Sequence, residues 1–152
     1  IMKKSTNLFG FFLMLFLGIF FVSCDFLDDH IKNPVRSKCN EKAVLDHVAF
    51  PLVNTANYGI TNVVLNGDCL EITLSSSGCN PNNWDMNLIG VASTTNIYPP
   101  LLHAKVELIN NEECLAVFQK TVSFDLTPFQ MAGQNTVQID IDGWNNNIVY
   151  QY

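Results

Sequence analysis

Two aspartates near the end of the chain have the spacing of metal ligands. Asp140–Asn145 reads D-x-D-G-x-N, a spacing of oxygen ligands that calcium loops use. Such a loop needs glycine at its sixth position, whereas Gly143 is fourth here. The pattern is more typical of a polar strand face that runs into an Asp-Gly turn, so we predict no metal site. A calcium-binding or hydrolytic domain that uses Asp140 and Asp142, with Asp125 on a neighbouring strand, is the alternative.

The residues that could support covalent catalysis do not form a recognisable set. None of the three histidines, His30, His47 and His103, accompanies a serine or cysteine nucleophile motif. Ser75–Gly78 lacks the Gly-x-Ser-x-Gly spacing of a nucleophile elbow. The sequence therefore predicts a protein with no catalytic residues, no enzymatic activity and no cofactor.

Five aromatic residues could bind a partner through their rings. Trp84, Tyr150 and Tyr152 belong to alternating apolar sets and are expected in the core. Tyr98 and Trp144 lie in predicted loops, where a sandwich usually carries function. These two are the candidate contacts for an envelope protein or a glycan.

The amino-terminal segment has the order of an export signal. Lys3 and Lys4 precede an uncharged apolar run, Leu8–Val22, which is shorter than the roughly 20 residues that span a bilayer. The run ends in Phe21–Cys24, which resembles a bacterial lipobox, with Phe21 in the place of the usual leucine. We therefore expect residues 1–23 to be removed and Cys24 to carry the lipid that anchors the protein to the membrane.

The segment after Cys24 is acidic and carries no structural pattern, so residues 24–38 are predicted to be a flexible tether. Asp25–Asp29 is similar to the acidic sorting signals of Bacteroidetes surface lipoproteins, which implies a place in the cell envelope at the outer membrane. After the cut, six Lys and Arg face 14 Asp and Glu, a formal charge of 6 − 14 = −8. This charge disfavours nucleic acid as a partner.

Four cysteines remain after Cys24, and an even number in an exported chain predicts disulfides. Cys69 and Cys79 flank one predicted strand, which is far too long for a disulfide to span. Two connectivities remain. We prefer Cys39–Cys69 with Cys79–Cys114 over Cys39–Cys79 with Cys69–Cys114.

The mature chain alternates apolar and polar residues from about Tyr58 onward, and turn residues such as Asn66-Gly67-Asp68 separate the alternating runs. This predicts an all-β, antiparallel, immunoglobulin-like sandwich of about seven strands over residues 39–152. A short helix over 40–47 is also expected. One helical turn near residues 128–132, capped by Thr127, should cross between the sheets. The expected inward-facing residues are Leu70, Ile72, Leu74, Met86, Leu88, Val106, Leu108, Val122, Phe124, Val137, Ile139 and Ile141.

Several short motifs, in order, resemble a group of uncharacterised flavobacterial (Bacteroidetes) lipoproteins. They are Asn66–Leu74, Ser77-Gly78-Cys79, Trp84, Leu88-Ile89, Pro99-Pro100, Cys114, Ser123–Pro128 and Ile148–Tyr152. The resemblance implies a lipid-anchored β-rich domain and no particular activity. Some members have a histidine where this chain has Asn82, so the resemblance implies no metal site here.

The signal and the lipobox predict that Cys24 is acylated. Cells fed a labelled fatty acid such as palmitate should incorporate the label into this protein, and Cys24→Ala should abolish the incorporation. A Cys24→Ala protein that still carried the label would contradict this assignment.

Overall fold

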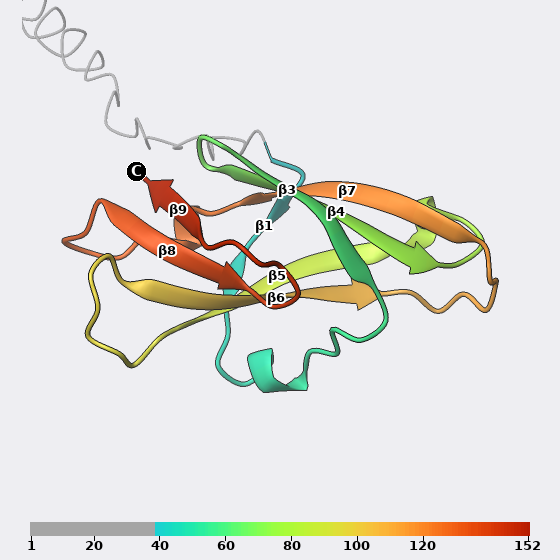
Figure 1. Cartoon of the computed structure of the whole chain (residues 1–152), viewed down its shortest axis with the longest axis horizontal. Coiled ribbons are helices and arrows are strands. Elements are labelled where there is room, and N and C mark those ends of the chain that lie inside the picture. The colour runs from blue at the N-terminus through green and yellow to red at the C-terminus, as the bar shows by residue number, and fades with distance from the viewer. Residues whose placement is uncertain (1–38) are drawn as a thin grey trace, which may run out of the picture. The chain divides into compact units, whose positions relative to one another are not determined.

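A computed structural model describes residues 39–152 of the protein (Figure 1). The predicted signal peptide and the whole predicted tether, with Cys24 and His30, lie outside the described residues. The helical segments among residues 39–152 are short 3₁₀ turns, and none of them could span a bilayer.

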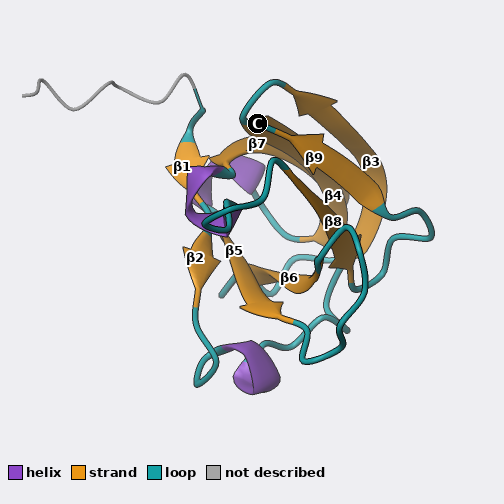
Figure 2. Cartoon of the chain, turned by 90° about the vertical axis from the view of Figure 1, so that its left-hand side faces the viewer, coloured by secondary structure: helices purple, strands orange, loops and turns teal. Residues whose placement is uncertain are grey.

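Residues 39–152 form nine strands in two sheets, which confirms the predicted β-sandwich (Figures 1 and 2). Three short 3₁₀ turns, η1 (Phe50–Leu52), η2 (Pro81–Asn83) and η3 (Thr127–Phe129), lie between strands. One sheet has the strand order β1-β7-β4-β3 and the other β2-β5-β6-β8-β9. The strands are β1 (Glu41–Lys42), β2 (Val44–Leu45), β3 (Gly59–Asn66), β4 (Cys69–Ser77), β5 (Asp85–Ala92), β6 (Leu101–Ile109), β7 (Val117–Asp125), β8 (Thr136–Ile141) and β9 (Ile148–Gln151).

The sandwich is not wholly antiparallel. β3 and β4 form a hairpin that closes at Gly67, whose φ of 59° suits glycine. β4 pairs with β7, and β5 with β6, in antiparallel register. β6 and β8 are parallel, however, because the chain leaves β7, crosses to the other sheet through η3 and enters it beside β6 in the same direction. β1 and β2 also form parallel pairs, with β7 and β5.

The expected helix over 40–47 is wrong, because this segment forms β1 and β2. The amide of Ala43 donates to the carbonyl of Asp125 in one sheet, at 3.0 Å. The amide of Asp46 donates to the carbonyl of Gly90 in the other sheet, also at 3.0 Å. Pairing with two distant strands therefore overrides the local helical pattern, and the segment joins the sheets along one edge.

The helical turn between the sheets is confirmed, but its predicted cap is not. η3 begins at Thr127 itself, and Leu126 precedes it without a side-chain cap. The Thr127 amide donates instead to Oδ1 of Asp125, at 2.9 Å. The side-chain Nε2 of Gln130 donates to the Tyr150 hydroxyl.

The predicted inward faces are correct. All twelve expected residues are buried, and Val122, the most exposed of them, has only 8% of its surface accessible. Trp84 and Tyr150 are fully buried, as expected, whereas Tyr152 is only partly buried. The alternation of apolar residues therefore identified the dry face of each sheet.

Truncation of Phe124 should cost about 3–5 kcal/mol of unfolding free energy, because its fully buried ring lies at the interface between the sheets. Asp140→Ala is the matched control, since Asp140 points outward and should change stability by only about 0.5 kcal/mol or less. Urea denaturation curves of the two variants check both values. A Phe124→Ala protein as stable as wild type would contradict the assigned faces.

Candidate functional site

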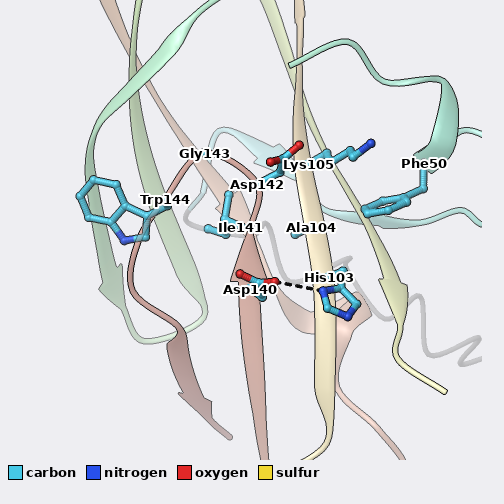
Figure 3. A pocket seen from close by; sticks show the side chains of 9 residues that line it. All are labelled: Phe50, His103, Ala104, Lys105, Asp140, Ile141, Asp142, Gly143 and Trp144. Carbon is cyan, nitrogen blue, oxygen red and sulfur yellow. Dashed lines mark hydrogen bonds and ion pairs between the residues drawn. The ribbon is translucent and has the colours of Figure 1, made fainter. Parts of the chain in front are cut away.

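A shallow hollow of about 340 Å³ lies on the outer face of the sheet that contains β6 and β8 (Figure 3). Phe50 of η1 lies on one side of it and Trp144, after β8, on the opposite side. Four side chains that can carry charge lie between these rings. The residues that line the hollow are Phe50, His103, Ala104, Lys105, Asp140, Ile141, Asp142, Gly143 and Trp144.

The alternation of side chains along β6 and β8 places these four charged or titratable groups on the outer face of the sheet. Ala104 on β6 and Ile141 on β8 are buried, each with 1% of its surface accessible, so the residues on either side of them face solvent. The parallel register sets His103 opposite Asp140, and His103 Nδ1 lies 3.1 Å from Asp140 Oδ2. Both side chains remain more than 40% exposed, so this pair adds little stability and stays accessible to a ligand.

Asp142 has its own partner from the segment before β3. Its Oδ2 accepts a hydrogen bond from the Thr55 hydroxyl at 3.0 Å. Nearby, the Tyr58 hydroxyl donates to the carbonyl of Val106 at 2.6 Å. Burial, and then the negative charge of Asp142, raise the pKa of Tyr58 to about 12. Tyr58, directly before β3, is therefore a neutral hydrogen-bond donor to the backbone of β6.

A backbone turn positions Trp144 at the hollow, and a side-chain contact positions Phe50. Gly143, at a φ of 84°, makes the turn after β8, and the Trp144 amide donates to the carbonyl of Ile141 at 3.0 Å. On the other side, Lys105 Nζ lies 4.8 Å from the centre of the Phe50 ring, a cation–π contact. Trp144 is partly buried and packs against the core, whereas its loop position predicted an exposed residue.

The structure does not bring the proposed carboxylates together in the expected way. Asp125 lies on β7 in the other sheet, so it is not a neighbour of Asp140 and Asp142 as the alternative function required. Over residues 39–152, no group of three or more His, Cys, Asp or Glu could hold a metal ion. The hollow therefore offers two carboxylates with protein partners, an imidazole and an ammonium group.

Tyr98, the other aromatic candidate, lies away from the hollow. It is 77% exposed in the loop between β5 and β6, and the preceding Ile97 is 48% exposed. Its exposure agrees with the prediction from the loop sequence. The structure thus separates Tyr98 and Trp144 into two surfaces.

The four cysteines form the preferred pairs, Cys39–Cys69 and Cys79–Cys114, with Cα atoms 5.5 and 5.0 Å apart. The first bridge ties the start of the described chain to β4. The second joins the loop after β4 to the loop before β7. The spacing of the cysteines had reduced the choice to two connectivities, and the fold selects one.

Sequence reasoning missed Glu112, which organises the loops around the second disulfide. Its carboxylate accepts hydrogen bonds from the amides of Cys79 (2.7 Å) and Asn80 (2.9 Å). It also accepts from Asn83 Nδ2 (2.9 Å) and Trp84 Nε1 (3.1 Å). These bonds, led by that from Asn80, lower the pKa of Glu112 from 4.5 to about 2. From the sequence alone, the residues around Glu112 are predicted only to form a turn.

Comparisons with known proteins identify the fold alone. No protein-family model and no curated protein matches the chain. A protein of unknown function, DUF1344, from Bacteroides vulgatus ATCC 8482 is similar with a TM-score of 0.51 and 14% identity, covering 74% of this chain and 56% of that chain. A NigD-like immunity protein from Bacteroides caccae ATCC 43185 is similar with a TM-score of 0.51 and 10% identity, covering 73% and 64%.

This chain therefore spans less than two thirds of either solved protein. Both come from Bacteroides, which fits the expected likeness to uncharacterised Bacteroidetes proteins. At these identities the shared feature is the sandwich, and no residue role can be transferred.

Glu112→Gln should destabilise the protein at neutral pH, because the amide cannot accept all the bonds that the carboxylate accepts. The folded-state pKa is lowered, so the stabilisation by ionised Glu112 is complete above pH 4.5 and is lost as the pH falls towards about 2. Urea midpoints measured across this range should show the two proteins converging. The exposed neighbour Glu113→Gln is the control. A difference that stayed constant down to pH 2 would refute the role of the charge.

Proposed function

We propose that this protein is a lipid-anchored cell-envelope protein, held at the outer membrane through Cys24, and that its sandwich binds a glycan without catalysis. The observation that carries the binding role is the hollow between Phe50 and Trp144 (Figure 3). The anchor rests on the signal and the lipobox in the sequence, and the net negative charge of the mature chain would not attract anionic lipids in its place.

The chemistry of the hollow suits a sugar ring. Aromatic faces such as those of Phe50 and Trp144 pack against the C–H groups of a sugar. Between them, Asp140 and Asp142 can accept hydrogen bonds from hydroxyl groups, and Lys105 can donate. The hollow, at about 340 Å³, is in the size range of small-ligand sites.

The charges in the hollow favour some sugars over others. Lys105 contributes one positive charge and Asp140 and Asp142 two negative charges, so the formal balance with neutral His103 is 1 − 2 = −1. A net negative surface repels carboxylated or sulfated sugars. We therefore propose neutral sugars or amino sugars as the ligand class.

The alternative function, a calcium-dependent or hydrolytic domain, has less support. Asp140 is paired with His103 and Asp142 accepts from Thr55, so both carboxylates have protein partners. The third carboxylate that this function invoked, Asp125, belongs to the other sheet and accepts from the Thr127 amide.

A protein partner is the second candidate, and the exposed loop that carries Ile97 and Tyr98 favours it. An exposed tyrosine beside an apolar residue is typical of the residues that dominate protein interfaces.

A glycan array of neutral, amino and acidic sugars, probed with the purified protein, tests the first candidate. Asp140→Ala should weaken glycan binding about tenfold or more, the cost of losing a hydrogen bond to a charged acceptor. Tyr98→Ala is the matched control and should bind glycans like wild type, because Tyr98 lies outside the hollow. Loss of binding in Tyr98→Ala alone would move the site to the loop, and no binding to any sugar would reject the glycan function.

A further inference from the structure

The turn that contains η1 exposes apolar side chains at its tip. Val48 is 78% exposed and Leu52 is 79% exposed, and Pro51 between them is also exposed. Figures 1 and 2 show this turn standing clear of the sandwich, at the end of the segment that follows β2. The preceding residues Val44 and Leu45 are 49% and 42% exposed.

The backbone donors of this tip are all satisfied within the turn. Asp46 Oδ1 accepts from the amides of Val48 and Ala49, each at 2.8 Å. The amide of Phe50 donates to the carbonyl of Asp46, that of Leu52 to Ala49 and that of Val53 to Phe50, while Pro51 has no amide hydrogen. Every backbone N–H group from residue 48 to residue 53 therefore has a protein partner. No N–H group would lose a hydrogen bond if the tip moved from water into an apolar phase.

A second exposed apolar site lacks this property. Leu115 is 90% exposed in the loop between β6 and β7. Within residues 39–152, the amides of Glu113 and Leu115 donate to no protein group, so they need water. Both loops expose apolar side chains. Of the two, only the η1 turn also has a protein partner for each of its backbone N–H groups.

We propose that the η1 tip, with Val48, Pro51 and Leu52 foremost, inserts into the surface of the lipid bilayer. This inference rests on the proposed anchor at Cys24. Residues 25–38 number 38 − 24 = 14, and 14 extended residues reach at most about 50 Å. The described chain starts on the side of the sandwich away from η1 (Figures 1 and 2), and this reach would still keep the bilayer at a high effective concentration near the tip.

The chemistry of the tip fits a shallow insertion among uncharged lipids. The mature chain is acidic, so attraction to anionic headgroups cannot hold the domain against the membrane, and apolar contact must do so. Phe50, in the same turn, forms a wall of the hollow (Figure 3). Insertion of the tip would thus place the glycan site beside the headgroup layer.

Depth-dependent fluorescence quenching tests this proposal on the full lipidated chain in phosphatidylcholine vesicles. A fluorophore is attached to Val48→Cys or Leu52→Cys and, as controls, to Leu115→Cys or Thr121→Cys, all at exposed positions. The quencher is a phosphatidylcholine with a nitroxide on its acyl chain. Labels at 48 and 52 should be quenched at least about twofold more than labels at 115 and 121, because only the tip reaches the acyl boundary.

Each other outcome overturns the proposal in a recognisable way. Equal quenching at all four positions in a chain that sediments with the vesicles would reject tip insertion and leave the anchor intact. Labels at 48 and 52 that are shielded from aqueous iodide but not quenched by the lipid would show that another protein segment, such as the tether, covers the tip. A chain that does not sediment with the vesicles would reject the anchor, and tip insertion with it.

Discussion

Burial of one face of each sheet against the other is the constraint on which the rest of the molecule depends. Leu70, Ile72 and Leu74 on β4 alternate with residues that face away from the core, and β6 and β8 alternate in the same way. A shift of one residue would expose the whole apolar set of a strand, so the register is strongly specified. Apart from Ser76 and Asp125, the polar and charged side chains of residues 39–152 consequently lie on the outer faces and in the loops, where both candidate binding surfaces lie.

The two ends of the sandwich are closed by contacts between distant segments. At one edge, the segment around Ala43 hydrogen-bonds to both sheets. Phe129 of η3 packs over Gly90, where a Cβ atom would lie 2.6 Å from the ring and displace it. At Gly78, a Cβ atom would lie 2.8 Å from both Glu112 and Trp84, so glycine allows the carboxylate to reach the loop amides. Small residues thus permit the close approaches that hold the crossovers in place.

The η1 turn links the two surfaces for which we propose a function. Its Phe50 ring lies against Lys105 and bounds the hollow, while Val48 and Leu52 on the same turn are exposed to the surroundings. Because Asp46 fixes the turn through hydrogen bonds to two successive amides, both surfaces are positioned by one local structure. The orientation of the domain that inserts the tip would therefore also set the orientation of the hollow relative to the membrane, as expected for a domain on a short tether.

The sequence by itself determined the all-β class and the inward faces, and it reduced the possible disulfide connectivities from three to two. These follow from the period of two along each strand and from turn residues such as Gly67, which are local properties of the chain. Only the tertiary structure decided that residues 41–42 and 44–45 are strands, that Asp125 and Asp140 belong to different sheets, and that Glu112 organises a loop. The pairing of His103 with Asp140 joins residues 37 positions apart, and that of Glu112 with Cys79 joins residues 33 apart. No local pattern encodes such contacts, because they arise only when the register between distant strands is set.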